Sequence, residues 1–586
     1  MKIKTNDLNN NTAYKKVRFR KSLALSLTAA VMISSLYGCG NKKSESDSIF
    51  GGSTSIGTTE AGKTNYGKSK SKTDNKYYND ALEGNMIYYE ECLDEACPPG
   101  GYIVVTPPNG GDSREYNEII ENAFIKVSEQ PDSTFAADTD TASYSNMRGY
   151  IAKYIAEDDP YYKENGGIVG YVPADAIRIE ELINYFNYDY AEPAEGEPFS
   201  YYSEIVDCPW NDGHKLLMLG LKTEDIDTEN LKDNNFVFLI DSSGSMDDAN
   251  KLPLVKTAFA RLVDELGDND TISIVTYAGS SEVVLDGVKG SEKQEILDAL
   301  DNIMAYGSTD GSDGIVTAYE LAESHFLKNG NNRVILATDG DLNVGITDED
   351  ELVELIDRKK KSGVYLSVMG FGFDNLKDNK LEALADNGNG QYSFIDNAFE
   401  AKKALVSEMG GNLVTVAKDV KLNVNFNGDM VDSYRLIGYE NRLMSREDFD
   451  DDTKDGGEIG AGHRLTVLYE LDLTDTAKKG SFTASEGDAE NAFLTLSVRY
   501  KEPDKDVSKL YEYKVGSESM NMLPSENIRW AEAVAAFGMI LRDSEFKGTA
   551  DFEMVRDLAS KVKSAEDDEI KQEFIKMVDA VILQEK

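Results

Sequence analysis

Three oxygen-bearing side chains stand at alternate positions after an apolar run near the middle of the chain. The run is Phe-Val-Phe-Leu-Ile, residues 236–240, and Asp241, Ser243 and Ser245 follow it directly. A carboxylate and two hydroxyls are hard oxygen ligands of the kind that Mg²⁺ prefers. In open α/β sheets, ligands bind at the carboxyl ends of buried strands. The segment therefore predicts a divalent-cation loop, although a Ser/Gly turn that caps the next helix is the alternative.

Two later segments offer further oxygen ligands. Residues 307–311 read Gly-Ser-Thr-Asp-Gly, and Asp339 follows a second apolar run at residues 334–336. Together with these, residues 241–245 resemble the metal-ion-dependent adhesion site of von Willebrand factor type A domains. The resemblance implies Mg²⁺ as the cofactor, with Mn²⁺ as a substitute, since Mg²⁺ needs few protein ligands and retains waters. The metal ligands that it implies are Asp241, Ser243, Ser245, Thr309 and Asp339.

Strands alternate with helices around these anchors. Residues 271–277 and 365–371 read as strands, and residues 251–266 as a helix with one apolar face. The alternation predicts an α/β fold with a doubly wound, mostly parallel sheet that is covered on both faces. If the strands are ordered as in the family, Asp241 and Asp339 converge at the topological switch. The other expected elements are strands at 282–285, 333–338 and 392–395, and helices at 292–304, 315–327, 348–361, 377–386 and 398–409.

Alternating apolar residues flank this α/β domain on both sides. They occur at residues 217–221 before it, and at residues 420–426, 465–471 and 494–500 after it. Alternation of this kind predicts strands with one buried face. Strands on both sides of an inserted domain suggest one β-sandwich that the domain interrupts. The chain then ends in a small helical region, for which helices at 531–541, 552–562 and 569–583 are expected.

Several further segments resemble a bacterial family of von Willebrand factor type A lipoproteins. The resemblance extends from about Tyr116 to the end of the chain. It implies flanking domains on both sides of the α/β domain, in a family whose members mostly lack an assigned molecular activity. The segments that carry the resemblance are residues 130–135, 138–144, 178–186, 208–211, 435–442 and 451–463.

The amino terminus has the features of a lipoprotein signal. A basic segment, residues 1–21, precedes an apolar stretch at residues 23–36 that is too short and polar for a permanent membrane span. Leu-Tyr-Gly-Cys, residues 36–39, resembles a lipobox, although Tyr37 departs from the usual small residue. We therefore expect lipidation of Cys39 and attachment to the cell membrane, facing outside the cytoplasm. An ordinary secretory signal with an incidental Cys is the alternative.

Length and charge bound the class of protein. The 586 residues include 61 Lys and Arg against 106 Asp and Glu, a net charge of −45, and 40% are hydrophobic. Several domains with substantial cores are expected at this length. Such an acidic chain repels nucleic acid and anionic membrane surfaces, so no nucleic-acid partner is expected. Residues 40–114 predict a flexible tether, in which Cys92 and Cys97 either form a disulfide or remain free thiols, and Cys208 has no obvious partner.

The resemblance implies a surface-anchored, metal-ion-dependent protein-binding or adhesion module rather than an enzyme. In it, an open Mg²⁺ coordination position accepts an acidic side chain from a partner protein. One alternative is a metal-dependent hydrolase, for which Asp247, Asp310 and Asp341 are candidate general bases. Another is an ion that only stabilises the loops of an envelope scaffold protein. The three histidines, His214, His325 and His463, are expected to be structural.

These predictions divide the chain into six parts. They are a signal peptide at 1–38, a flexible linker at 39–114, an N-terminal flanking domain with a helical start and then strands at 115–234, the von Willebrand factor type A domain at 235–410, a β-rich flanking domain at 411–520 and the helical region at 521–586.

Overall fold

The computed structural model describes most of the chain after residue 113. Cys39, Cys92, Cys97 and Thr309 lie outside the described residues, so the predictions made for them have no structural counterpart here. No helix among the described residues is sufficiently long and apolar to cross a membrane. The described ranges are residues 114–138, 140–225, 232–307, 311–340, 349–373, 376–408, 415–478, 492–503 and 505–586.

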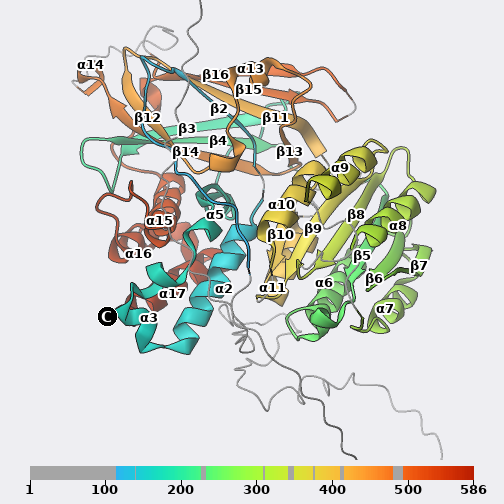
Figure 1. Cartoon of the computed structure of the whole chain (residues 1–586). Coiled ribbons are helices and arrows are strands. Elements are labelled where there is room, and N and C mark those ends of the chain that lie inside the picture. Colours follow the sequence, from blue (N-terminus) through green and yellow to red (C-terminus); the bar gives the residue numbers. More distant parts are fainter. Residues whose placement is uncertain are drawn as a thin grey trace, which may run out of the picture. The chain divides into compact units, whose positions relative to one another are not determined.

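A six-stranded sheet forms the centre of the α/β domain, in the order β10-β9-β8-β5-β6-β7 (Figure 1). Neighbouring strands are parallel except at the edge, where β7 runs antiparallel to β6. The first strand of the domain, β5, lies between β6 and the fourth strand, β8, so the topological switch lies where the family resemblance implied it. The strands are β5 (Asn234–Asp241), β6 (Thr271–Tyr277), β7 (Ser281–Lys289), β8 (Asn331–Thr338), β9 (Tyr365–Phe371) and β10 (Tyr392–Ile395).

Helices cover both faces of this sheet. Successive strand residues point to opposite sides, so they pack against different helices. Phe238 packs in one apolar cluster with α6, α7 and α11, whereas Leu239 packs in another with α8, α9 and α10. The predicted helix at 398–409 begins as an α-helix and continues as a π-helix. The helices are α6 (Leu252–Glu265), α7 (Lys293–Asp301), α8 (Gly311–Ser324), α9 (Glu349–Lys360), α10 (Asp378–Asn387), α11 (Ala398–Lys402) and the π-helix η4 (Lys403–Glu408).

The α/β domain interrupts a β-sandwich. One sheet has the order β1-β12-β14-β4-β3, and the other has the order β13-β11-β15-β16 with β2 also paired to β11. Each sheet thus combines strands that precede the domain with strands that follow it, and one apolar cluster lies between the two sheets. The strands are β1 (Ile125–Lys126), β2 (Asp132–Ala136), β3 (Phe199–Asp207), β4 (Lys215–Thr223), β11 (Thr415–Phe426), β12 (Val431–Ile437), β13 (Gly457–Gly460), β14 (Arg464–Leu473), β15 (Leu494–Lys501) and β16 (Lys509–Val515).

The prediction of one buried face is wrong for β4. Leu217 and Leu219 point into the sandwich, but Leu216 and Met218 are also fully buried, in a cluster formed with helices from before and after the α/β domain. These helices pack against each other and against the outer face of the first sheet (Figure 1). They are α2 (Ala142–Glu157), α4 (Gly167–Tyr171), α5 (Ile179–Asn184), α15 (Glu526–Leu541), α16 (Phe552–Ser560) and α17 (Glu569–Gln584).

Shorter helical segments connect the larger elements. Trp530 is fully buried among the helices of this cluster. The short segments are α3 (Pro160–Glu164), η1 (Ala174–Ala176), η3 (Gly244–Asp247), η5 (Glu440–Arg442), α13 (Arg446–Asp450), α14 (Asp475–Lys478), η7 (Ser517–Ser519) and η8 (Lys563–Glu566).

Candidate metal centre

The carboxyl ends of two neighbouring strands bring Asp241 and Asp339 to the same edge of the sheet. β5 ends at Asp241, β8 ends at Thr338, and the parallel register pairs Ile240 with Ala337. Asp339 is the next residue after β8. Both carboxylates are buried, with exposed fractions of 0% for Asp241 and 1% for Asp339. The strand order therefore places two carboxylates together at the topological switch.

The loop after β5 turns its hydroxyls toward each other. The Ser243 N–H donates to Asp241 Oδ1 at 2.9 Å, and the hydroxyls of Ser243 and Ser245 are hydrogen-bonded at 2.9 Å. The other carboxylate oxygen, Asp241 Oδ2, accepts from the Thr338 hydroxyl at 3.0 Å. Ser243 is buried and Ser245 is exposed, so the cluster is accessible from the side of Ser245.

The segment that leads to Thr309 is joined to this loop by backbone hydrogen bonds. The Tyr306 N–H donates to the Ser242 carbonyl at 2.7 Å, and the Gly244 N–H donates to the Gly307 carbonyl at 3.1 Å. Gly307 has a φ of +82°, which favours glycine. These bonds hold Gly307, two residues before Thr309 in the sequence, beside the loop that follows β5. Assignment of the five residues as metal ligands stays a prediction.

Burial and like charge act together on the two carboxylates. Burial raises the pKa of Asp241 to about 7, and the neighbouring Asp339 carboxylate raises it as well, while the hydrogen bonds from Ser243 and Thr338 oppose the shift. Burial also raises the pKa of the Tyr277 phenol, and Asp241 adds to that shift. A pair of carboxylates this deep in the protein is stabilised by any cation that can reach it.

The donor set fits a hard divalent cation. Two buried carboxylates and two hydroxyls provide oxygen ligands only, and each Asp241 oxygen accepts a protein hydrogen bond yet retains a second lone pair. Within the described part of the chain, no group of three or more His, Cys, Asp or Glu side chains is arranged to hold a metal. Oxygen ligands of this kind favour hard divalent cations over softer ions, which prefer nitrogen and sulfur.

Sequence reasoning missed Lys251, which lies directly before α6. Its ammonium group pairs with Asp339 Oδ2 at 3.1 Å, and the side chain is only 2% exposed. Its position in the sequence was noted as the start of a helix. No local signal indicated that its charge would reach Asp339, which follows β8 and lies 88 residues away in the sequence.

The alternative acid–base candidates gain no support from their positions. Asp247 is exposed in the loop after β5, and Asp310 and Asp341 lie outside the described residues. His214 pairs with Glu470 at 2.8 Å in the sandwich, whereas His325 pairs with Asp286 at 2.7 Å just after α8. The helix predicted at 315–327 includes His325, but α8 ends at Ser324. Burial lowers the pKa of His463 to about 4.

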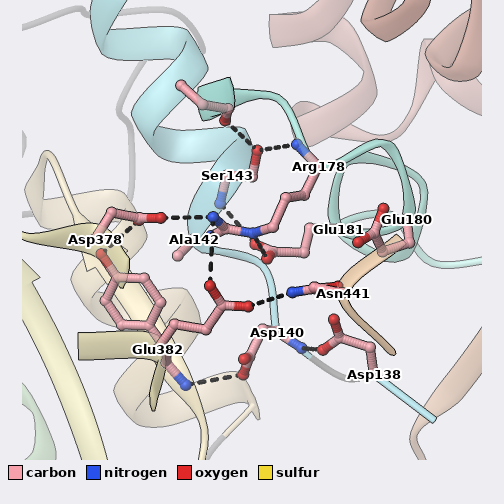
Figure 2. A network of polar contacts seen from close by, with 12 residues as sticks. Asp138, Asp140, Ala142, Ser143, Arg178, Glu180, Glu181, Asp378, Glu382 and Asn441 are labelled. Carbon is pink, nitrogen blue, oxygen red and sulfur yellow. Dashed lines mark hydrogen bonds and ion pairs between the residues drawn. The ribbon is translucent and has the colours of Figure 1, made fainter. Parts of the chain in front are cut away.

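A network of buried charges joins the flanking helices to the α/β domain, and sequence reasoning did not find it. Figure 2 shows Arg178, at the start of α5, among Glu181, Asp378 and Glu382. Asp378 and Glu382 belong to α10, and burial raises the pKa of Glu382 to about 8. Ser143 N–H donates to Glu181 at 2.8 Å. The only sequence signal was that residues 138–144 and 178–186 carry a family resemblance.

A second arginine extends the network from the sandwich. Arg442 pairs with Asp138 at 3.0 Å, with Asp140 at 3.3 Å and with Asp386. Burial, followed by the negative charge of Asp138, raises the pKa of Asp140 well above its usual range, and Asp140 Oδ1 accepts from the Tyr392 N–H of β10 at 2.9 Å. Asp138 and Asp140, which precede α2, therefore contact Arg442 of the sandwich, and Asp140 also contacts β10 of the α/β domain.

Comparison with known proteins places these observations in a family. Three family profiles match: "von Willebrand factor" over residues 111–218, "von Willebrand factor type A domain" over residues 235–408, and "Uncharacterized protein YfbK, C-terminal" over residues 411–583. The chain is 38% identical over 487 residues to the uncharacterized protein YfbK of Escherichia coli (strain K12), covering 80% of this chain and 81% of that protein.

Two other similarities are more restricted. Over 164 residues the chain is 31% identical to inter-alpha-trypsin inhibitor heavy chain H4 of Homo sapiens, which covers 26% of this chain and 17% of that protein. A solved structure of a von Willebrand factor type A protein from Catenulispora acidiphila is 16% identical and has a TM-score of 0.39, covering 65% of this chain and 89% of that one. The fold is shown by the matching profile and by the strand order of the sheet.

Proposed function

Because the chain belongs to the family of Escherichia coli YfbK, a bacterial family with a von Willebrand factor type A domain, we propose that it is a metal-dependent protein-binding module. Asp241, Ser243, Ser245, Thr309 and Asp339 hold Mg²⁺, or Mn²⁺ in its place. The bound cation supplies an electrophilic position that accepts a carboxylate of a partner protein. The observation that carries the proposal is the convergence of two buried carboxylates with the Ser243 and Ser245 hydroxyls, 2.9 Å apart.

The character of the relatives supports binding over catalysis. The matched domain is shared with a protein named as an inter-alpha-trypsin inhibitor heavy chain. Of the three candidate general bases, Asp247 is the one that lies in the described residues, and it is exposed to solvent. These two observations favour a binding role over hydrolysis.

Exposed apolar side chains stand next to the metal loop. Met304 and Tyr306 have exposed fractions of 71% and 55%, and the Tyr306 backbone donates to the Ser242 carbonyl. Aromatic and methionine side chains are enriched at protein interfaces. Their position supports a partner that presents an acidic side chain beside an apolar one.

Replacing Thr309 with alanine should abolish Mg²⁺-dependent partner binding while the cooperative fold is kept. The reason is that Thr309 is proposed to complete the metal shell, and in the sequence it lies in the Gly-rich segment 307–311, outside the predicted strands and helices. The measurement is a crosslinking pull-down from the native cell envelope with Mg²⁺ or with EDTA, followed by identification of the partner and a titration of its affinity. Thermal melting of each variant is recorded alongside.

The control is Thr317→Ala, the same substitution on α8, where the hydroxyl donates to the Asp313 carbonyl. It should bind the partner as the wild type does. Equal partner affinity of Thr309→Ala and wild type would show that the open coordination position is not used. A melting shift with Mg²⁺ but no saturable partner would instead favour an ion that only stabilises the loops.

Membrane attachment through Cys39 is the second part of the proposal. Cys39→Ala should stop incorporation of a palmitate analogue and release the protein from the membrane, while Cys208→Ala, at a buried thiol in the fold, should leave labelling unchanged. One acyl chain anchors only marginally, so stable attachment implies a multiply acylated cysteine. Mass spectrometry of the mature amino terminus checks this, and an unmodified Cys39 there would rule the anchor out.

A further inference from the structure

Glu180 is a carboxyl group buried where α5 meets the sandwich. Its exposed fraction is 1%, and in the part of the chain that the structure describes neither carboxyl oxygen has a hydrogen-bond partner. Figure 2 shows Glu180 near Glu181, without a hydrogen bond to any residue drawn. An ionised carboxylate is rarely buried in this way, because nothing replaces the water that it loses.

The cation that faces Glu180 is Arg542, at the end of α15, and its nitrogens are directed to other acceptors. Arg542 Nε donates to the Ile177 carbonyl at 3.0 Å, and Nη2 donates to the same oxygen. Nη1 pairs with Glu440 at 2.6 Å and lies 3.7 Å from Glu121. Among the residues that the structure places, Glu180 thus has no ion-pair partner.

The other titratable groups around Glu180 come from four directions. Burial, followed by the negative charges of Glu440 and Asp138, raises the pKa of Glu180 to about 8, while Arg542 opposes the shift. These surroundings favour the neutral acid over the carboxylate. The groups that face Glu180 besides Arg542 are Glu440 of η5, Asp138 before α2, Glu181 on α5 itself and the Tyr439 phenol after β12.

The backbone leaves the Glu180 side chain no room to turn toward water. A Cβ atom built on Gly438 would lie 2.5 Å from Glu180 Oε2 and 2.7 Å from the Glu180 nitrogen, and Gly438 has a φ of +81°. One turn further along α5, Asn184 Oδ1 accepts from the Thr466 N–H of the sandwich at 2.7 Å. Glu180 therefore reaches water only if α5 separates from the loop after β12.

We infer that Glu180 is a neutral carboxylic acid in the folded protein, and that its proton holds α5 between the sandwich and α15. Loss of the proton leaves an unpaired buried charge, which is relieved when α5 separates and the carboxylate reaches water. Arg178, at the start of α5, pairs with Asp378 of α10, so the same helix also links the sandwich to the α/β domain. Glu180 thus makes this link sensitive to pH.

The direction of the pH dependence follows from the raised pKa of Glu180. Once α5 has separated, Glu180 lies in water and has its ordinary pKa of 4.5, against about 8 in the folded protein. The stabilisation by the neutral acid is therefore fully present below pH 4.5 and is lost as the pH rises to about 8. Between these values the separation releases one proton, so its equilibrium constant should rise about tenfold per pH unit.

The test is hydrogen–deuterium exchange of the full-length mature protein between about pH 5.5 and pH 7.5, with EDTA present so that no divalent cation contributes. Peptides from residues 177–186 are followed by mass spectrometry and corrected for the intrinsic exchange rate. Wild type should lose protection of α5 about tenfold per pH unit relative to Glu180→Gln, which keeps the shape of the side chain and is always neutral. The infrared spectrum at neutral pH should contain a protonated-carboxyl band that Glu180→Gln lacks.

The matched control is Glu569→Gln, which makes the same change at an exposed position in the first turn of α17. It should match the wild type in both measurements. The inference is overturned if Glu180→Gln and wild type have the same pH dependence, or if the protonated-carboxyl band is unchanged in Glu180→Gln. An ionised Glu180 paired with Arg542 would instead give protection that is independent of pH in this range and greater in wild type than in the variant.

A second variant covers the case in which Glu180→Gln does not fold. Glu180→Leu is neutral and similar in size, so it should keep the protection of α5 independent of pH and lack the protonated-carboxyl band. Protection of α5 in the wild type that stays constant between about pH 5.5 and pH 7.5 overturns the inference without any variant.

Discussion

Replacing Arg178 with methionine should lower the free energy of unfolding by about 3–5 kcal/mol, because it leaves buried carboxylates without their cation. Arg178 pairs with Glu181 and with Asp378, at 2.5 Å from the latter, and the two acids are 0% and 1% exposed. Methionine keeps much of the side-chain volume, so the loss comes mainly from the charge. Chemical denaturation of the mature protein measures it.

The control is Arg446→Met, which removes an exposed arginine that pairs with Asp450 at 2.6 Å. An exposed pair of this kind contributes about 1 kcal/mol or less. In a double-mutant cycle, Asp378→Asn should recover part of the loss in Arg178→Met, because the unpaired charge is then absent. Additive losses in the cycle, or a cost for Arg178→Met no larger than for Arg446→Met, would contradict the role of this ion pair.

Because Asp378 belongs to α10 and Arg178 to the flanking helices, the same substitution should loosen the two parts from each other. The segment before α2 is also attached to both parts through Asp138 and Asp140. Limited proteolysis should therefore cleave Arg178→Met faster than wild type near residues 138–142, while Arg446→Met is cleaved at the wild-type rate.

Asp241→Ala should abolish the rise in melting temperature that Mg²⁺ or Mn²⁺ produces in the wild type. A cation at about 100 times its dissociation constant stabilises the folded state by about 2.7 kcal/mol, since it binds only that state. Asp241 provides a buried carboxylate that Ser243 and Thr338 orient by hydrogen bonds. Differential scanning calorimetry with and without the cation checks the loss.

Asp247→Ala is the control, because it removes an exposed carboxylate from the same loop. It should retain the full cation-dependent shift. Asp241→Asn tests whether the charge or the shape of the side chain matters, since it preserves most of the volume and should still lose the shift. An equal shift in Asp241→Ala and wild type would mean that the cation binds elsewhere.

The sequence predicted well those features that depend on local periodicity. The strands at 271–277, 365–371 and 392–395 have the predicted bounds, and the interrupted sandwich is confirmed. Position relative to a strand end, together with the strand order that the family resemblance implied, also predicted that Asp241 and Asp339 converge, because neighbouring parallel strands terminate at one edge of a sheet. The first kind of prediction uses only the local period of the chain, whereas the second also needs the strand order.

Burial on the second face of β4 was missed, because the helices that cover it come from segments before and after the α/β domain. Leu216 and Met218 pack with helices such as α5 and α15, which lie far apart in the sequence. Alternation along a strand reveals one buried face. It does not show whether helices from elsewhere in the chain cover the other face.

By itself, the sequence determined the α/β domain, the sandwich around it and the oxygen-bearing side chains at the strand ends. Only the tertiary structure decided which charges meet: Lys251 with Asp339, Arg178 with Asp378 and Arg442 with Asp138. The chain has 106 acidic residues, so composition offers each of these cations many acceptable partners. The pairs are selected by burial, because a charge removed from water must take the opposite charge that folding brings within reach.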